Sequence, residues 1–265
     1  MATFQELLAH KRLKMGTYIG EFATPGIGRI LKTAGCEFAF VDMEHSGFSF
    51  ETVKSLLRHL HDCGIASVVR PPSKATHHVS RALDIGAQGV IPPMMETVDQ
   101  AETLVRQTNY PPGGSRGAAF GIAHDDYRPR PVKEAVAAAN ARTTAVALIE
   151  TANGVTNVDG IASVDGLDCL WLGHLDLSNS QGIPGEFDNP VFTDAVAAVM
   201  KAGTAHGKSI GRLAGSPDEG ARLFSEGCDL ICYSGDIWLF IAALGEAIAA
   251  VRSQVGDAVA GGHQS

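Results

Sequence analysis

The chain has 265 residues, of which 45% are hydrophobic and 19% are charged, and its formal net charge is −8. This composition excludes general disorder and supports a sizeable core in one large domain or two small ones. Because Lys and Arg form no cluster and no stretch approaches the ~20 apolar residues of a membrane-spanning helix, we expect neither a nucleic-acid nor a membrane partner.

The first segment, MATFQELLAHKRLK, lacks the apolar core of a signal peptide and predicts a short amphipathic helix over residues 2–13. The five cysteines stand at positions 36, 63, 169, 228 and 232 and include no CxxC pair. This arrangement is typical of free thiols in a reducing compartment, so we expect a cytoplasmic protein.

Short apolar runs then alternate with longer segments of helical periodicity. The runs are nearly continuous in apolar residues, which is typical of strands covered on both faces, and they span 16–22, 38–43, 66–70, 89–93, 145–150, 169–174, 209–214 and 230–235. Eight such units predict an α/β protein with a (β/α)8 TIM barrel, as a single domain over residues 1–265. A doubly wound sheet is the alternative, but it usually has fewer strands and a GxGxxG turn, which is absent here.

One connection, residues 110–144, is long, and its first half is rich in Pro, Gly and polar residues, whereas 133–142 has a helical pattern. Long excursions in compact domains are usually lids or binding loops. In this one, Arg116 within GGSRG could bind an anion, and His124-Asp125-Asp126 could line the site or cap the helix that follows. We expect the tail, from about 256 to 265, to be loose.

In (β/α)8 enzymes the active site lies at the carboxyl ends of the strands. At those ends this chain places acidic, basic and imidazole side chains, and no comparable set occurs at the strand starts; the set is Asp42, Glu44, His45, Arg70, Glu150, Asp176, Arg212 and Asp236. We therefore expect these groups to converge on one rim of the barrel.

Glu150 and Asp176 form a candidate metal pair, since two carboxylates on neighbouring strands repel unless a cation lies between them. Two protein ligands leave room for water and a chelating substrate, which suits a hard divalent ion such as Mg²⁺ or Mn²⁺. Alternatively, each carboxylate forms a salt bridge with an arginine at the rim.

His45 and Asp42 could form a base and the carboxylate that orients it, or His45 could be a hydrogen-bonded loop histidine. Arg70 could stabilise an enolate oxygen, or it could pair with Asp42 or Glu44. Both roles of Arg70 are compatible, because the same carboxylates can aim its guanidinium.

Six motifs carry a resemblance to a known family: DMEH, VVRPP, DIGAQGVIPPM, YPPGGSRG, LIET and LGHLDLS. In this order and spacing they resemble the class II metal-dependent pyruvate aldolases of the HpcH/HpaI type, over residues 4–250 or so. The resemblance implies a barrel with an exchanged C-terminal helix and a homohexamer built from dimers. The C-terminal pattern IWLFIAALGEAIAAV is apolar enough for such a helix, but an ordinary packed eighth helix would have the same pattern. The resemblance also implies a divalent metal ion, Mg²⁺, Mn²⁺ or Co²⁺, as cofactor.

The resemblance assigns roles to rim residues. Glu150 and Asp176 match the metal ligands, and Arg70 matches the residue that holds the keto oxygen of pyruvate. His45 with Asp42 matches the acid/base dyad, which works with a metal-bound water. Backbone amides around Gly173, His174 and Leu175 would hold the pyruvate carboxylate.

Three departures from the family pattern alter the pocket. Leu148 stands where the family usually has Gln, and His174-Leu175 stands where it has Pro-Ala. In the long excursion, Ala123-His124-Asp125 stands where relatives have Arg-Ala-Ser. The metal, base and enolate residues are kept.

The function that the resemblance implies is that of a carbon–carbon lyase. We expect reversible retro-aldol cleavage of a 4-hydroxy-2-oxo acid to pyruvate and an aldehyde, through a metal-bound pyruvate enolate. One alternative is oxaloacetate decarboxylation through the same enolate, as in the macrophomate-synthase branch of the family. Another is a barrel that binds a small 2-oxo acid without turnover.

Overall fold

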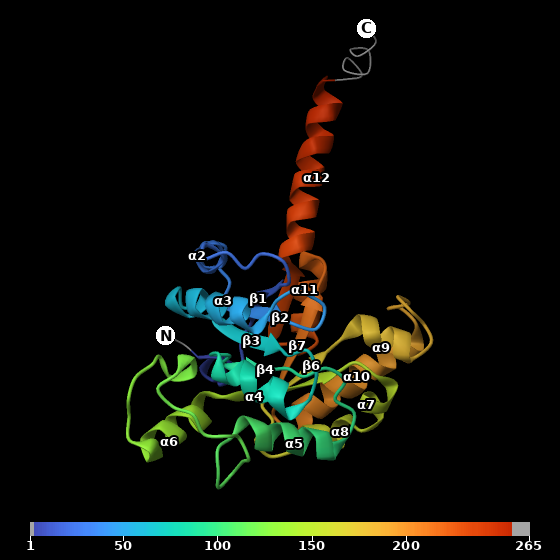
Figure 1. Ribbon diagram of the computed structural model, residues 1–265. Helices are drawn as coiled ribbons and strands as arrows, with labels where there is room; N and C mark the ends of the chain where they lie inside the picture. The colour runs from blue at the N-terminus through green and yellow to red at the C-terminus, as the bar shows by residue number, and fades with distance from the viewer. Residues whose placement is uncertain (1–2, 256–265) are drawn as a thin grey trace.

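The computed structural model describes residues 3–255, and its centre is a closed barrel of eight parallel strands (Figure 1). The strands are β1 Lys14–Ile19, β2 Phe38–Asp42, β3 Ala66–Arg70, β4 Gly89–Val90, β5 Thr144–Ile149, β6 Cys169–Leu172, β7 Ser209–Ala214 and β8 Leu230–Gly235. Each strand pairs in parallel with the next along the chain, and β8 pairs with β1 to close the barrel. The predicted (β/α)8 fold is confirmed.

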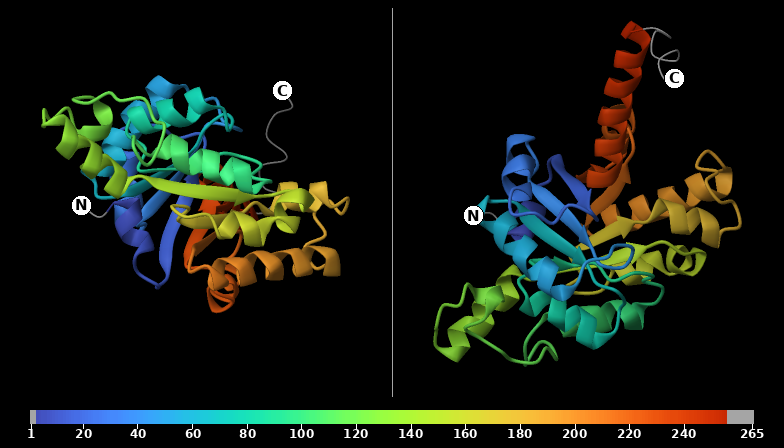
Figure 2. Two further views of the ribbon diagram at one scale, coloured as in Figure 1. Left: turned by 90° about the horizontal axis from the view of Figure 1, so that it is seen from below. Right: turned by 45° about the horizontal axis from the view of Figure 1, so that its top comes forward.

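The helices follow the strands, and most of them lie against the outside of the barrel, whereas α12 projects from it (Figure 2). They are α1 Phe4–Leu8, α2 Ile27–Thr33, α3 Phe50–Asp62, α4 Thr76–Asp84, α5 Val98–Thr108, the 3₁₀ turn η1 Ala123–Asp125, α6 Val132–Arg142, α7 Ala152–Thr156, α8 Val158–Ala162, α9 His174–Ser180, α10 Pro190–Ala205, α11 Pro217–Ser225 and α12 Asp236–Val255. Several begin at a side-chain cap: the hydroxyls of Ser49, Thr97 and Ser216 each accept a hydrogen bond from the backbone N–H three residues on.

The largest differences from the predicted boundaries occur in three elements. The N-terminal helix predicted over 2–13 ends at Leu8, because the chain must then turn to enter β1 in register with β8. The same pairing starts β1 at Lys14 and ends it at Ile19, earlier than the predicted 16–22. β4 is only two residues long, since Pro92 and Pro93 follow and have no backbone N–H to continue the ladder.

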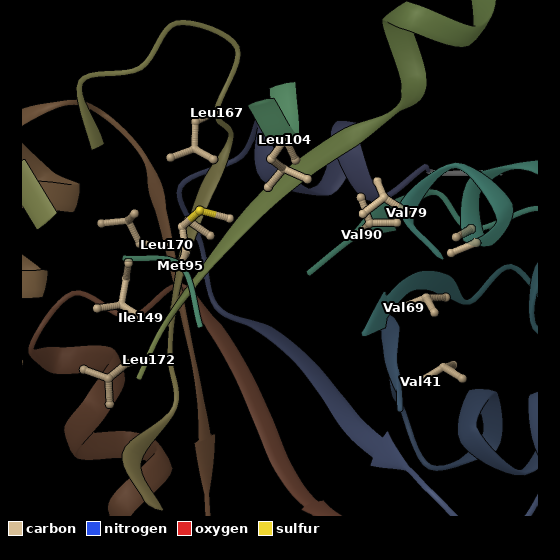
Figure 3. Close-up of a cluster of buried hydrophobic side chains, with 14 of the residues drawn as sticks. Val41, Val69, Val79, Val90, Met95, Leu104, Ile149, Leu167, Leu170 and Leu172 are labelled. Carbon is tan, nitrogen blue, oxygen red and sulfur yellow. The ribbon is translucent and has the colours of Figure 1, made fainter. Parts of the chain in front are cut away.

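Side chains along each strand alternate between the barrel interior and the helix layer. The outward residues pack against the helices in a large buried cluster, which includes Val41, Val69, Val90, Ile149 and Leu172 (Figure 3). The inward residues fill the barrel in a second cluster, which includes Phe38, Phe40, Val68, Val146, Leu148 and Trp171. The next inward positions on β2, on β3 and directly after β5 are 42, 70 and 150. The alternation therefore directs Asp42, Arg70 and Glu150 into the carboxyl-end mouth of the barrel.

The C-terminal helix α12 projects away from the barrel rather than packing on it (Figures 1 and 2). Its large apolar side chains are exposed: Trp238, Leu239, Phe240, Ile241, Leu244, Ile248, Val251 and Val255. This arrangement differs from an ordinary packed eighth helix and has the form expected of an exchanged one. Within residues 3–255, no helix has the length and apolarity to cross a membrane. The tail predicted to be loose, 256–265, lies outside the described residues.

Candidate active site

The carboxylate of Asp42 lies at the barrel mouth and is fully buried. It accepts two hydrogen bonds from Arg70, from Nε at 2.7 Å and from Nη2 at 2.8 Å. It also accepts one from the Tyr18 hydroxyl at 2.8 Å and two from the backbone N–H groups of Glu44 and His45. Burial opposes the ionised form, but the hydrogen bonds and charge of Arg70 outweigh it and hold the pKa of Asp42 below its usual value.

The imidazole of His45 does not meet Asp42 as the predicted base–carboxylate pair requires. The hydrogen bond from His45 to Asp42 comes from the backbone N–H, at 3.2 Å. The ring instead lies beside Glu44, with Nε2 3.7 Å from Oε2, and its side chain is 60% exposed. The carboxylate oxygens of Asp42 are already occupied by Arg70, Tyr18 and two amides. Asp42 therefore orients the guanidinium of Arg70 rather than the ring.

Glu150 is 2% exposed and is fixed in place by its surroundings. Its Oε1 accepts a 2.7 Å hydrogen bond from the backbone N–H of Met94. A Cβ added to Gly173 would lie 2.7 Å from both Cβ and Oε2 of Glu150, so only glycine fits beside this carboxylate. Burial raises the pKa of Glu150 to about 7; Met94 and Arg70 oppose the rise and Asp176 adds to it.

Asp176 lies in the first turn of α9 and shares a cavity of about 290 Å³ with Glu150, Arg70 and His45. The residues fit a hard cation. Neither Glu150 nor Asp176 forms an ion pair within residues 3–255, because Arg70 pairs with Asp42 and Glu44 instead. Burial destabilises the ionised form of Glu150, and the neighbouring carboxylates add to that effect; a cation between them would relieve both.

In the described part of the chain, no group of three or more His, Cys, Asp or Glu side chains is arranged to hold a metal ion. The two carboxylates of Glu150 and Asp176 would therefore leave coordination positions for substrate and water oxygens. The buried Oε2 of Glu44 has no hydrogen-bond partner within residues 3–255, although Arg70 Nη1 lies 3.2 Å away. It is a further acceptor at the edge of the same site.

The segment predicted to hold a carboxylate, Gly173 to Leu175, begins α9. The N–H of Gly173 donates to the carbonyl of Ile149 at 3.0 Å and is not free for a ligand. The amides of His174 and Leu175 belong to the first helical turn, whose N–H groups have no partner within a helix. The ring of His174 is largely enclosed, and burial lowers its pKa to about 4.

The rest of the cavity wall is apolar and aromatic. Leu148 lies in this wall, and its companions are Tyr18, Phe40, Trp171, Leu172, Leu175, Leu213, Cys232, Ile237 and Trp238. Sequence reasoning missed Tyr18 and Trp238. The inward alternation of β1 could have indicated Tyr18, but nothing local to Trp238 indicates that the first turn of a projecting helix closes the cavity.

Several predicted rim residues lie elsewhere. Arg212 faces the helix layer, and Asp236 accepts hydrogen bonds from the backbone of residues 20–22. In the long excursion, Arg116 forms an ion pair with Asp84, and the ring of His124 is hydrogen-bonded to the Ala119 carbonyl and to Arg142. The carboxylate of Asp125 accepts a hydrogen bond from the backbone N–H of Gly121. The carboxylate of Asp126 accepts one from Arg58. None of these residues lines the cavity, and neither Asp125 nor Asp126 caps α6, which begins at Val132.

Comparison with known proteins adds four findings. The family model described as HpcH/HpaI aldolase/citrate lyase matches residues 18–243. The chain is 31% identical over 240 residues to a 5-keto-4-deoxy-D-glucarate aldolase of Shigella boydii, covering 91% of this chain and 92% of that protein. It is 28% identical over 258 residues to a hydroxypyruvate/pyruvate aldolase of Cupriavidus necator, covering 97% and 95%. The crystal structure of an HpcH/HpaI aldolase from Desulfitobacterium hafniense matches with a TM-score of 0.90 at 27% identity, covering 95% of this chain and 97% of that one.

Proposed function

The chain belongs to the HpcH/HpaI aldolase/citrate lyase family and is a carbon–carbon lyase, and on that premise we propose that it reversibly cleaves a 4-hydroxy-2-oxo acid to pyruvate and an aldehyde. The observation that carries the proposal is the guanidinium of Arg70, which Asp42 aims at the cavity containing Glu150 and Asp176. A fixed cation at this position suits a 2-oxo acid, because it can stabilise the negative charge that develops on the keto oxygen.

We propose that Glu150 and Asp176 hold a divalent metal ion: Mg²⁺, Mn²⁺ or Co²⁺. When bound there, such an ion supplies Lewis-acid polarisation of the substrate's keto group. The support for this assignment is the burial of Glu150 beside a second carboxylate without a cationic partner for either group in residues 3–255.

The chain's own residues would perform the remaining steps. The amides of His174 and Leu175 would bind the substrate carboxylate, and Arg70 would donate hydrogen bonds to the keto oxygen. His45 Nε2 would take the proton of the 4-hydroxyl group as the C3–C4 bond breaks and the aldehyde leaves. The bond's electrons remain on the pyruvate half as an enolate, whose charge Arg70 would stabilise. Delivery of the proton held by His45 to C3 then gives pyruvate and restores the neutral imidazole.

The test is pyruvate release from a panel of 4-hydroxy-2-oxo acids and from oxaloacetate, with chelator-treated protein and with each metal restored. Metal-dependent cleavage of a hydroxy-oxo acid is expected. Pyruvate from oxaloacetate alone would identify a decarboxylase. Binding of pyruvate without turnover of any panel member would identify a binding-only barrel.

A matched pair of variants tests the metal ligands. Glu150→Gln removes the charge of the buried carboxylate with little change of shape, and it should abolish both metal binding and turnover. Glu134→Gln, at an exposed position in the first turn of α6, should change neither. Full turnover in the Glu150→Gln variant would contradict the metal assignment.

We also propose that the chain forms a homo-oligomer, a hexamer by family resemblance, through the exposed apolar face of α12. Truncation before α12 should then lower the number of protomers per particle, as measured by light scattering.

The five cysteines are free thiols, which supports the cytoplasm as the proposed location. A small-molecule substrate is the other partner that the cavity requires.

A further inference from the structure

Arg212 was expected at the catalytic rim, but it lies on the outer face of β7. The residues two positions before and after it, Ile210 and Ala214, pack in a buried cluster with Leu223 of α11. Arg212 shares their side of the strand and therefore points between α10 and α11. It plays no part in the cavity that holds Glu150 and Asp176.

The side chain of Arg212 is buried with few partners. It is 4% exposed, and its closest carboxylate contact is a 3.5 Å approach of Nη2 to Oε1 of Glu219. Its Nε has no hydrogen-bond partner within residues 3–255. The guanidinium carbon lies 5.6 Å from the centre of the Phe192 ring. A buried charge is normally paired and fully hydrogen-bonded, so this guanidinium has the capacity to bind a further acceptor.

Next to this guanidinium is a cavity of about 520 Å³ between α10 and α11. One wall is mainly apolar and comes from α10, with Phe192, Val196, Ala197 and Met200. The opposite wall is charged and comes from α11. The cavity therefore offers a buried cation at its base and hydrocarbon along one side.

The charges around the cavity limit what can bind. Arg222 donates to Glu226 at 2.8 Å, so that pair is satisfied internally. Glu219 Oε2 accepts the backbone N–H of Gly215 at 2.8 Å. With Asp188, the wall carries three carboxylates against two arginines, which would repel a dianion such as phosphate. A single carboxylate group matches the planar fork of one guanidinium and adds the least repulsion.

We propose that this cleft binds a small monocarboxylate with a short hydrocarbon chain. The carboxylate pairs with Arg212, and the chain packs on Phe192, Val196 and Met200. The cleft lies one layer of side chains from the catalytic cavity: the Phe192 ring contacts Phe187, and Phe187 contacts His174, each with centroids 5.3 Å apart.

The probe is isobutyrate, and its neutral isostere isobutyramide is the control ligand. Isobutyrate at 10 mM should raise the melting temperature of the full-length protein, and isobutyramide should not. Arg212→Met should weaken isobutyrate binding at least tenfold, as measured by calorimetry. Arg106→Met removes an exposed arginine on α5 and should leave the affinity unchanged.

Two further measurements separate this cleft from the catalytic cavity and from misfolding. Hydrogen exchange should show that isobutyrate protects residues 190–205 and 217–225. Ala197→Phe, which fills the cavity from α10 and keeps Arg212, should also abolish binding. Protection confined to the segments around residues 150 and 173–176 would overturn the proposal, as would the absence of any isobutyrate response or an equal response to phosphate.

Discussion

Replacing Asp42 with Asn tests whether this carboxylate acts through Arg70 or through His45. The substitution keeps the shape of the side chain but removes its charge and turns one oxygen into a donor. The native carboxylate accepts five hydrogen bonds, two of them from Arg70. An amide cannot accept all five, and its NH₂ group would face donors.

The magnitude follows from the burial of the pair. Asp42 is fully buried and the Arg70 side chain is 12% exposed, so the exchange breaks a buried ion pair. Such a loss costs about 3–5 kcal/mol of unfolding free energy. In the proposed mechanism, a guanidinium that is no longer aimed at the keto oxygen is equivalent to a lost oxyanion donor, and such a loss lowers kcat by about 10²–10³-fold.

The assay is a pair of double-mutant cycles on kcat for pyruvate release, with urea unfolding as the stability control. One cycle combines Asp42→Asn with Arg70→Lys, and the other combines it with His45→Gln. Since Asp42 contacts the Arg70 guanidinium but only the backbone of His45, the first cycle should give a coupling energy of roughly 1–3 kcal/mol. The second should stay below about 0.5 kcal/mol.

The reverse result would refute the reasoning. A large coupling between Asp42 and His45, with near-additivity between Asp42 and Arg70, would restore the predicted dyad. A shift of the imidazole limb of the pH–rate profile in Asp42→Asn would support the same conclusion.

The remaining predictions concern the rest of the site and the fold. Gly173→Ala should lower pyruvate release at least ~100-fold, because the added Cβ would lie 2.7 Å from Glu150 Oε2; wild-type kinetics would contradict this. Tyr18→Phe removes a buried hydroxyl that donates to Asp42 and should cost roughly 1 kcal/mol in urea unfolding, with kcat reduced about tenfold or less. Burial lowers the pKa of His61 to about 4, so the unfolded chain binds a proton near pH 6.5 that the folded chain does not. The contribution of neutral His61 to the free energy of unfolding should be complete above pH 6.5 and be lost as the pH falls to 4. The urea midpoint of the His61→Gln variant should therefore change less with pH over that range than the midpoint of the wild type, and an equal pH dependence of the two would refute this.

Much of the site could be predicted because strand alternation is a local property. Asp42 and Arg70 continue the inward series of β2 and β3, and Glu150 continues that of β5 just past its last residue. The same rule could not place Arg212. β7 carries apolar residues on both faces, Ile210 outward and Leu213 toward the cavity, so its sequence does not reveal which side is interior.

Partners contributed by distant segments could not be predicted. The loop after β2 folds so that the backbone of His45, rather than its ring, reaches Asp42, and no spacing rule distinguishes these contacts. The hydroxyl of Tyr18 reaches the same carboxylate from β1. Both outcomes depend on how the elements pack, which local patterns do not encode.

The start of α12 connects the projecting helix to the groups of the candidate active site. The buried carboxylate of Asp236 accepts hydrogen bonds from the backbone N–H groups of residues 20–22, which ties the helix to the loop after β1. Trp238 then packs on Tyr18, with ring centroids 5.2 Å apart. Because Tyr18 in turn bonds to Asp42, which holds Arg70, any assembly that fixes the direction of α12 would also fix the cavity wall around the Arg70 guanidinium. The helix that exposes eight large apolar side chains is therefore joined to the proposed catalytic centre through three successive side-chain contacts.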